Sequence, residues 1–357
     1  MNRHKYVGMD VDQSTCVIEI EDKAGNFVME TYLPTRASEL RAFFKGLDGR
    51  IHVAFEEGTQ AAWLYELIEP LVEDVVVCDR RGEKVRGNKG DRLDARMLAR
   101  QLRQGELRRV YQGERGHREL KELIRGYDYL VEDVVRTKSR LKAAFRSRGL
   151  KCSGRAVYRK GDREDWLKKI DVDALRARVS SLYEQLDCLM RLHKEAKDAM
   201  ITGAKKHPSY KLLVKQPGLG PVRSAQILGI VGTPHRFRTK RQFWPYCGLA
   251  VVVHESSEYE IVDGQRRRRK RPLRTRGLNK NFNRTLKMVF KGAAKTVIAR
   301  EPFKQYYQRL IDKQIRPEMA KLTVARKISA ITLSILKTGE EFDPNRVNQA
   351  VSDSGDQ

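Results

Sequence analysis

The sequence predicts a chain of mixed class, in which an α/β domain is followed by mostly helical domains. Strand-like apolar runs alternate with helical patterns in the first third, apolar residues repeat at helical spacing through the middle, and further helical patterns fill the last third. Hydrophobic residues make up 40% of the 357 residues, which is enough for packed cores. We expect four parts, over residues 1–113, 114–207, 208–345 and a flexible tail over 346–357.

The first third reads as a sheet covered by helices. We expect a helix over 38–47 with Ser38 as its N-cap, a second over 63–68, and a third over 92–102 with Leu93, Met97 and Leu98 toward a core. A hairpin signal joins the second and third strands at 23–26. The expected strands are 6–11, 16–20, a third starting at 27–29, 51–55 and 75–78.

The middle third has the apolar spacing of long helices. From Leu175 the apolar positions step by 4, 3, 4 and 3 residues to Leu189, which is a heptad seam. An earlier segment, over 120–145, is also apolar at helical spacing, and a basic connector with glycines separates the two. We expect two long antiparallel helices, which pair either with each other or with another copy as an oligomerising coiled coil.

The last third contains a turn of the type found in helix-hairpin-helix elements. Gly218 and Gly220 stand in Gln-Pro-Gly-Leu-Gly, and an apolar helix follows over 222–231. Glycine lets the backbone approach a phosphate, and a helix N-terminus presents N–H groups to it. The alternative is a simple turn at the start of a helix. Further helices are expected over 279–300, 302–314 and 317–337.

Four acids occupy positions from which they can converge. Asp10 ends the first strand, Glu56 ends the fourth, and Asp91 and Asp94 open a helix at i, i+3 spacing, which places them on one face. Such a cluster repels itself unless a cation neutralises it, and Mg²⁺ takes hard oxygen ligands, with Mn²⁺ as a substitute. The acids that open the helix have a second interpretation, because acids at helix N-termini complement the macrodipole. Asp12 and Glu57 are neighbours that compete for the same assignments.

A dense basic run follows a loop that contains Ser256. Eight of the eleven residues from 266 to 276 are basic and none is acidic. Such a run binds polyanions by counterion release, although many runs of this kind are solvated tails or localisation signals. Ser256 by itself carries no nucleophile signal. The basic residues are Arg266, Arg267, Arg268, Arg269, Lys270, Arg271, Arg274 and Arg276.

The net charge of the chain indicates which classes of partner it binds. Lys and Arg number 72 against 46 Asp and Glu, giving a net charge of +26. This excess predicts a polyanionic partner, which is most often nucleic acid, with membrane headgroups as the alternative. We expect no membrane span, because no run of about 18 apolar residues exists. The N-terminus has no signal-peptide pattern, and the five cysteines form no Cys-x-x-Cys pair, so we expect a cytoplasmic protein without zinc or disulfides.

Taken together, these motifs resemble the DEDD-type transposases of the insertion-sequence one-ten family. The resemblance rests on Gly8-Met9-Asp10, on the acids after the fourth strand, and on Lys89-Gly90-Asp91-Arg92-Leu93-Asp94. It continues through the Gly218 turn, through residues 243–250, and through His254-Glu255-Ser256. The ordered combination covers roughly residues 6–343.

The resemblance implies an N-terminal RuvC-like domain of RNase H fold, a coiled-coil middle and a C-terminal transposase domain. It implies that Asp10, Glu56, Asp91 and Asp94 hold Mg²⁺ and that Ser256 attacks the DNA backbone to form a phosphoserine link. The family commonly has Gly after this serine, whereas this chain has Ser257, so two adjacent serines compete for the role. Family members act as dimers or tetramers on element ends and target DNA, and some pair both DNAs with a structured bridge RNA.

Three functions are therefore open to test. The first is a recombinase of a bacterial insertion sequence, nucleoid-associated, that cuts and rejoins DNA through the serine. The second is a metal-dependent nuclease or junction resolvase that uses water and needs only the carboxylates. The third is a non-catalytic nucleic-acid-binding protein, which needs only the charge.

Overall fold

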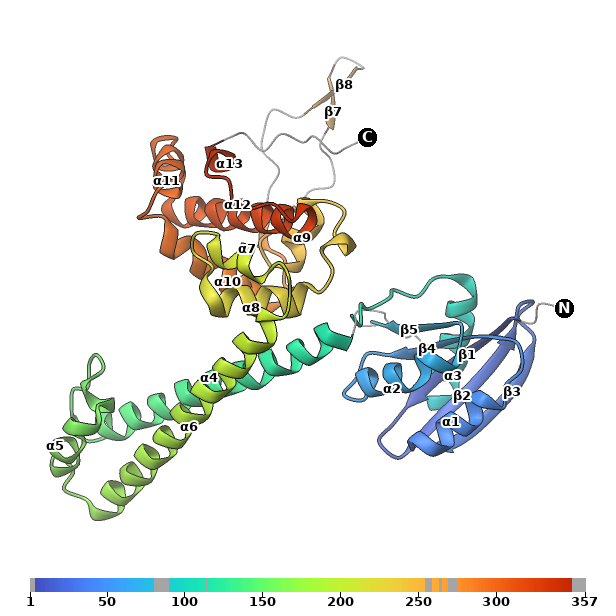
Figure 1. The fold of residues 1–357 in the computed structure, drawn as a ribbon, viewed down its shortest axis with the longest axis horizontal. Helices are drawn as coiled ribbons and strands as arrows, with labels where there is room; N and C mark the ends of the chain where they lie inside the picture. The colour runs from blue at the N-terminus through green and yellow to red at the C-terminus, as the bar shows by residue number, and fades with distance from the viewer. Residues whose placement is uncertain are drawn as a thin grey trace. The chain divides into compact units, whose positions relative to one another are not determined.

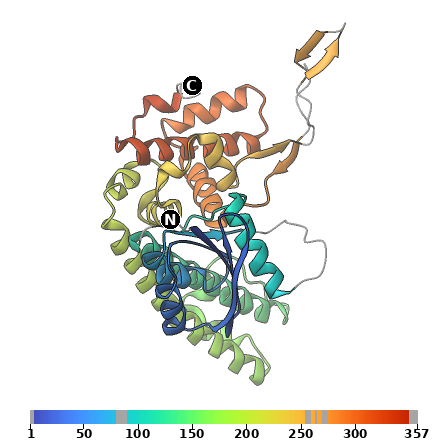
Figure 2. The same cartoon turned by 90° about the vertical axis from the view of Figure 1, so that its right-hand side faces the viewer.

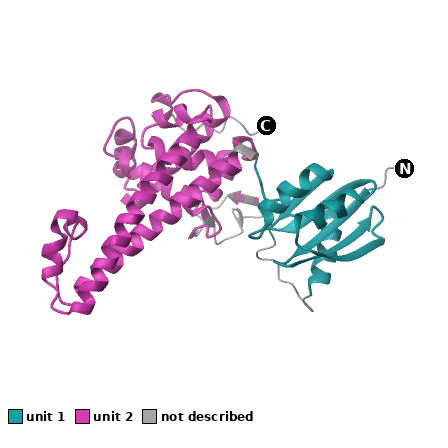
Figure 3. Ribbon diagram, turned by 60° about the horizontal axis from the view of Figure 1, so that its bottom comes forward, with its two compact units in different colours: residues 1–113 teal, residues 114–357 magenta. Residues whose placement is uncertain are grey.

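The computed structural model divides the chain into two compact units, Met1–Gly113 and Glu114–Gln357 (Figure 3). In the part of the chain that the structure describes, no helix is long and apolar enough to cross a membrane. The described residues are 4–79, 90–113, 115–253, 259–262, 265–268 and 275–348.

The first unit is built on a five-stranded mixed sheet with the order β3-β2-β1-β4-β5 (Figure 1). The first three strands form antiparallel pairs, whereas β4 lies parallel to β1 and β5 parallel to β4. All five expected strands are present, and the third continues to Pro34. The strands are β1 (His4–Val11), β2 (Thr15–Asp22), β3 (Phe27–Pro34), β4 (Arg50–Glu56) and β5 (Asp74–Cys78).

Helices cover both faces of this sheet. Alternate strand residues, such as Val7 and Phe55, are buried in one core with α1 and α2. The intervening residues, such as Ala54 and Val76, pack with Leu98 of α3 in a second core. The strand period of two therefore assigns each strand residue to one helical layer. The helices are α1 (Ala37–Lys45), α2 (Ala61–Ile68) and α3 (Asp91–Gln104), with a short 3-10 helix, η1 (Glu69–Leu71).

Two details of the expected helices are wrong. Helix α1 begins at Ala37 with Arg36 in the N-cap position, so Ser38 lies inside the first turn and does not cap it. In α3, Leu93 is 45% exposed, whereas Ala95, Leu98 and Ala99 are buried. The helix approaches the sheet so closely that small side chains form most of its buried face.

The second unit contains a long helical hairpin. Helices α4 (Arg115–Arg146) and α6 (Asp173–Lys205) pack along each other and extend from the remaining helices, as Figure 1 shows. The heptad residues Val179 and Leu186 are buried in one core with Leu141 and Phe145 of α4. The seam is thus filled by the chain's own helix, and pairing between copies through this hairpin stays a prediction. The connector holds η2 (Ala156–Tyr158), η3 (Lys160–Asp162) and α5 (Arg163–Lys168).

The rest of the second unit is a helical cluster around α12 (Pro317–Thr338), which has buried residues on every side. A short helix at the C-terminal end, α13 (Asn345–Asn348), buries Val347, so packed structure continues past residue 345. Two antiparallel strand pairs, β6 with β9 and β7 with β8, belong to the same unit (Figure 2). The remaining elements are α7 (Tyr210–Lys215), α8 (Gly220–Val231), η4 (Pro234–Arg236), α9 (Lys240–Tyr246), β6 (Val251–Val253), β7 (Tyr259–Val262), β8 (Gln265–Arg268), β9 (Thr275–Leu278), α10 (Arg284–Val297) and α11 (Phe303–Asp312).

Candidate active site

The ends of two adjacent parallel strands place Asp10 beside Glu56. The register of β1 on β4 runs to the pair Met9 and Phe55, so the two acids are the next residues on neighbouring strands. The buried apolar residues that precede them, Met9 and Phe55, pack toward α1 and α2. The alternation of a strand therefore directs both carboxylates to the sheet face that α3 covers.

Helix α3 approaches this face at Gly8. A Cβ atom at Gly8 would lie 2.0 Å from the carbonyl oxygen of Ala95 and 2.5 Å from the backbone nitrogen of Ala99. Only glycine permits this contact between helix and strand backbones. Asp91 lies one helical turn before Ala95 and therefore on the same stripe of the helix, with Asp94 beside it. The contact at Gly8 thus sets the position of both acids relative to Asp10.

The electrostatics show that the four acids are neighbours. The pKa of Asp10 is raised to about 6, first by burial and then by the negative charges of Asp91, Asp94 and Glu56. A hydrogen bond from the backbone of Val11 opposes this effect. The structure therefore brings together the four acids that the sequence singled out, from two strands and one helix. Asp12 lies in the exposed turn after β1.

A row of ion pairs holds α3 against the sheet. Arg96 Nε lies 2.6 Å from Oε1 of Glu19, which is only 1% exposed. Two further pairs join Arg103 to Glu21 at 3.1 Å and Arg92 to Glu30 at 2.5 Å. The sequence interpretation missed these three glutamates. Acids at alternate positions of an apolar strand, such as Glu19 and Glu21, are the signal that points to partners across a sheet face.

The donor set of the cluster fits a hard divalent cation. Four carboxylates that repel one another are stabilised by such an ion, and carboxylate oxygens are its preferred ligands. Among the residues that the structure describes, no three His, Cys, Asp or Glu side chains are arranged to hold a metal ion as they stand. The four acids interact through their charges, as the raised pKa of Asp10 indicates.

In the second unit, the described structure stops three residues before Ser256, which lies outside the described residues together with Ser257. The strand that leads to it, β6, is firmly anchored. Arg326 Nε donates to the carbonyl of Leu249 at 2.7 Å, and the backbone nitrogen of Asn279 donates to the carbonyl of Ala250. Gly248 has φ +65, and a Cβ there would lie 2.7 Å from the ring of Phe282. The last described residues before Ser256 are therefore held in a fixed position.

The basic run is only partly described. Arg266, Arg267 and Arg268 lie on β8, and Arg276 lies on β9, with Arg267 exposed. On β8 the register pairs Arg267 with Glu260 of β7. The run therefore spans two strands that belong to different pairs. Arg269, Lys270, Arg271 and Arg274 lie outside the described residues.

The glycine turn joins α7 to α8 as two helices linked by a tight connection. Gly218 has φ +86 and lies against α10, where a Cβ would meet Val297 at 2.7 Å and the carbonyl oxygen of Ala293 at 3.0 Å. Gly220 has φ +61 and open space around it. Packing against α10 thus explains Gly218, and phosphate contact by this turn stays a prediction.

These features define the class of the protein. A mixed sheet with carboxylates gathered at the ends of adjacent strands, joined in one chain to a strongly basic helical unit, is the architecture of proteins that process nucleic acids. A family model described as Transposase, of the DEDD type, matches residues 7–147, and a model described as Transposase IS116/IS110/IS902 family matches residues 210–308. The chain belongs to the IS110 family of transposases.

A relative in Sinorhizobium fredii supports this assignment. The protein y4qE of strain NBRC 101917 / NGR234, which bears the name of a transposase, is 23% identical to this chain over 273 residues. The match covers 72% of this chain and 65% of y4qE.

Proposed function

We propose that the protein is a recombinase that moves an insertion sequence by cutting and rejoining DNA. The observation that carries the proposal is the convergence of Asp10, Glu56, Asp91 and Asp94 on one sheet face, in a chain of the IS110 transposase family. The strand order β3-β2-β1-β4-β5, with three antiparallel strands followed by two parallel ones, supports an RNase H-like fold of the RuvC type for the first unit.

In this proposal the four carboxylates hold Mg²⁺, or Mn²⁺ in its place. The bound cation would polarise a DNA phosphate and lower the cost of deprotonating an attacking hydroxyl. Asp10 and Glu56 would hold the cation from the ends of β1 and β4, and the contact of α3 at Gly8 would keep Asp91 and Asp94 in place. Asp10 and Asp94 are half-buried, whereas Glu56 and Asp91 are exposed, so the site is open to a phosphate from solvent.

Ser256 is the proposed nucleophile. Its Oγ attacks phosphorus, a new P–O bond to serine forms, and one P–O bond to a sugar oxygen breaks. The serine proton passes to solvent and the departing sugar oxygen takes up one proton. In the second step a sugar hydroxyl from the other DNA attacks the phosphoserine and restores the serine. The number of P–O bonds is unchanged throughout, so rejoining needs no external energy source.

Adduct formation on DNA tests this mechanism. The full chain is incubated with Mg²⁺ and labelled DNA taken from either side of its own gene, and a denaturing gel separates covalent protein–DNA adducts. We expect adducts from the native protein and from Ser257→Ala, and none from Ser256→Ala. Asp10→Asn is expected to lower adduct yield by at least about 100-fold, the usual scale for loss of a group that stabilises charge in the transition state.

The result separates the competing functions. Cleavage without adducts, unchanged in Ser256→Ala, would establish a nuclease that uses water. Binding without any cleavage, unchanged in Asp91→Asn, would establish a non-catalytic binding protein.

The proposed partners are element ends, target DNA, a structured bridge RNA and further copies of this chain. The charge of +26 supports nucleic-acid partners, and the density of basic residues from Arg266 to Arg276 in the sequence supports phosphate binding by this run. Assembly as a dimer or tetramer would let the carboxylates of one copy meet the serine of another. Sequencing of RNA that copurifies with the chain tests the guide, and light scattering with and without DNA measures the number of copies.

A further inference from the structure

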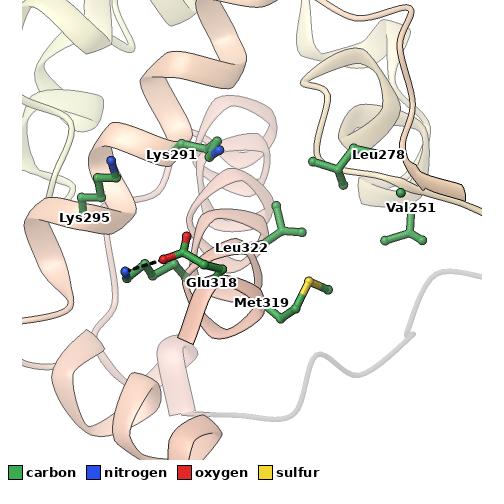
Figure 4. A pocket seen from close by; sticks show the side chains of 9 residues that line it. Val251, Leu278, Lys291, Lys295, Glu318, Met319 and Leu322 are labelled. Atoms are coloured by element: carbon green, nitrogen blue, oxygen red, sulfur yellow. Dashed lines mark hydrogen bonds and ion pairs between the residues drawn. The ribbon is translucent and has the colours of Figure 1, made fainter. Parts of the chain in front are cut away.

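A cavity of about 390 Å³ lies in the second unit and is lined by residues of that unit alone (Figure 4). Helices α10 and α12 and the β6–β9 pair enclose it. One part of its wall is apolar, with the side chains of Val251, Leu278, Met319 and Leu322, and the opposite part carries lysines from α10. The cavity is therefore amphipathic, with separate apolar and cationic walls.

The cationic wall has an excess of positive charge. Lys291 and Lys295 lie one turn apart on α10, so their side chains share a helix face. Lys321 lies 3.0 Å from Glu318, and this pair lines the same cavity. Since Glu318 is matched by Lys321, the charges of Lys291 and Lys295 remain in excess for an anionic ligand. Both are exposed to solvent.

The cavity is also lined by the strand that precedes Ser256 in the chain. Val251 and Leu278 pair directly in the register of β6 and β9, and both line the cavity. The chain leaves β6 at Val253 and reaches Ser256 three residues later, a span of at most about 11 Å. The cavity is therefore close along the chain to the proposed nucleophile.

We propose that the cavity binds one unpaired nucleotide, with its base on the apolar wall and its phosphate on Lys291 and Lys295. This inference rests on the proposed function, because it places an unstacked nucleotide beside the reacting phosphate. The volume is at the small end of ligand pockets, which run from about 300 to 1,000 Å³, and it excludes a duplex. Enzymes that act on unstacked bases hold them between apolar side chains. The apolar wall offers few polar groups that could distinguish one base from another, so we expect it to take any base.

The test uses three labelled duplexes that differ at one position. The first carries a single unpaired base, the second an abasic residue at that place, and the third is fully paired. We measure affinity for the full chain by fluorescence anisotropy, with the bulged strand as DNA and then as RNA. We expect the unpaired base to strengthen binding about 5-fold or more over the abasic duplex, the scale of stacking one base on a protein surface. Comparison of the DNA strand with the RNA strand shows which nucleic acid supplies the unpaired nucleotide.

Two exposed methionines provide a matched pair of variants. Met319 lines the cavity and is 44% exposed, whereas Met288 on α10 is 66% exposed and does not line it. Met319→Trp fills the cavity and is expected to abolish the base preference, while binding of the paired duplex changes less than about 2-fold. Met288→Trp is expected to keep the preference. The double variant Lys291→Ala with Lys295→Ala is expected to weaken the bulged duplex about 10-fold more than the paired one.

Each outcome has a definite meaning. Equal affinity of the native chain for all three duplexes overturns the proposal, as does a preference that survives Met319→Trp. A Met319→Trp variant that changes only the number of copies in solution also overturns it, because the cavity then holds another chain. Ser256→Ala should keep the base preference. If adducts fail but the preference stands, only the proposed function is wrong, and if adducts form without a preference, only the cavity proposal is wrong.

Discussion

The contact between Gly8 and α3 makes a quantitative prediction. In Gly8→Ala the new Cβ would lie 2.0 Å from the Ala95 carbonyl oxygen, whereas ordinary contact begins at 3.4 Å. The atoms that it meets are backbone, so α3 must retreat by roughly 1.4 Å as a body. Overpacking of this kind costs about 1–3 kcal/mol. For a unit of this size we expect a fall in melting temperature of roughly 5–15 °C.

The same displacement should affect the site. Asp91 and Asp94 move with α3, and a misplacement of about 1 Å in a catalytic arrangement costs on the order of 100-fold in rate. We therefore expect Gly8→Ala to weaken Mn²⁺ binding, measured by calorimetry, and to reduce adduct yield by about that factor. Thermal unfolding followed by circular dichroism gives the stability.

Gly46→Ala is the matched control. Gly46 ends α1 with φ −81, and a Cβ there has its nearest contacts at an ordinary 3.5 Å, so we expect native stability and native metal binding. A Gly8→Ala protein that melts like the native chain would refute the close approach. Lower stability with unchanged Mn²⁺ affinity would refute the inference that this contact positions Asp91 and Asp94.

Three further predictions concern charged groups. The pKa of Asp10 is raised from 3.8 to about 6, so without metal the folded state loses stability as the pH rises from about 4 to 6. Asp10→Asn should therefore raise the free energy of unfolding at pH 7 by about 1 kcal/mol, after allowance for solvent screening. Urea unfolding in the presence of a chelator measures this change. Arg96→Ala leaves the buried Glu19 without its ion pair and should lower the free energy of unfolding by about 2 kcal/mol. Arg125→Ala removes an exposed ion pair and should lower it by less than about 0.5 kcal/mol. Equal losses in the two variants would contradict the argument from burial. Asp128 of α4 accepts hydrogen bonds at 2.9 Å from Gln226 of α8 and from Thr285 of α10. Asp128→Ala leaves both donors without this partner and should lower the free energy of unfolding by about 2–3 kcal/mol. An unchanged melting curve would show that these bonds do not contribute to stability.

Local pattern was sufficient to predict most elements. The five strands and the helices α3, α8, α10, α11 and α12 follow from apolar periodicity, because each element buries one face or stripe of its own sequence. The errors fall where a neighbouring element decides. Leu93 is exposed because α3 approaches β1 through small residues, and a pattern of large apolar side chains cannot reveal that contact.

The candidate site divides in the same way. Asp10, Glu56, Asp91 and Asp94 were recognisable because acids at strand ends and helix starts are placed by local geometry. The ion-pair partners of Arg92, Arg96 and Arg103 on α3 could not be recognised from the sequence. Glu19, for example, is 77 residues from Arg96 in the chain but 2.6 Å away in space. Likewise the cavity beside β6 is formed by segments that no single motif contains.

The sequence by itself determined the order of the elements, the positions of the four acids and the excess of positive charge, because these depend on residue type and spacing along the chain. Only the tertiary structure decided that α3 lies directly on Gly8, that the acids raise the pKa of Asp10, and that the heptad seam of α6 is filled by α4. Close packing and charge interaction fall off within a few ångströms, so they depend on distances in space that spacing in the chain does not specify.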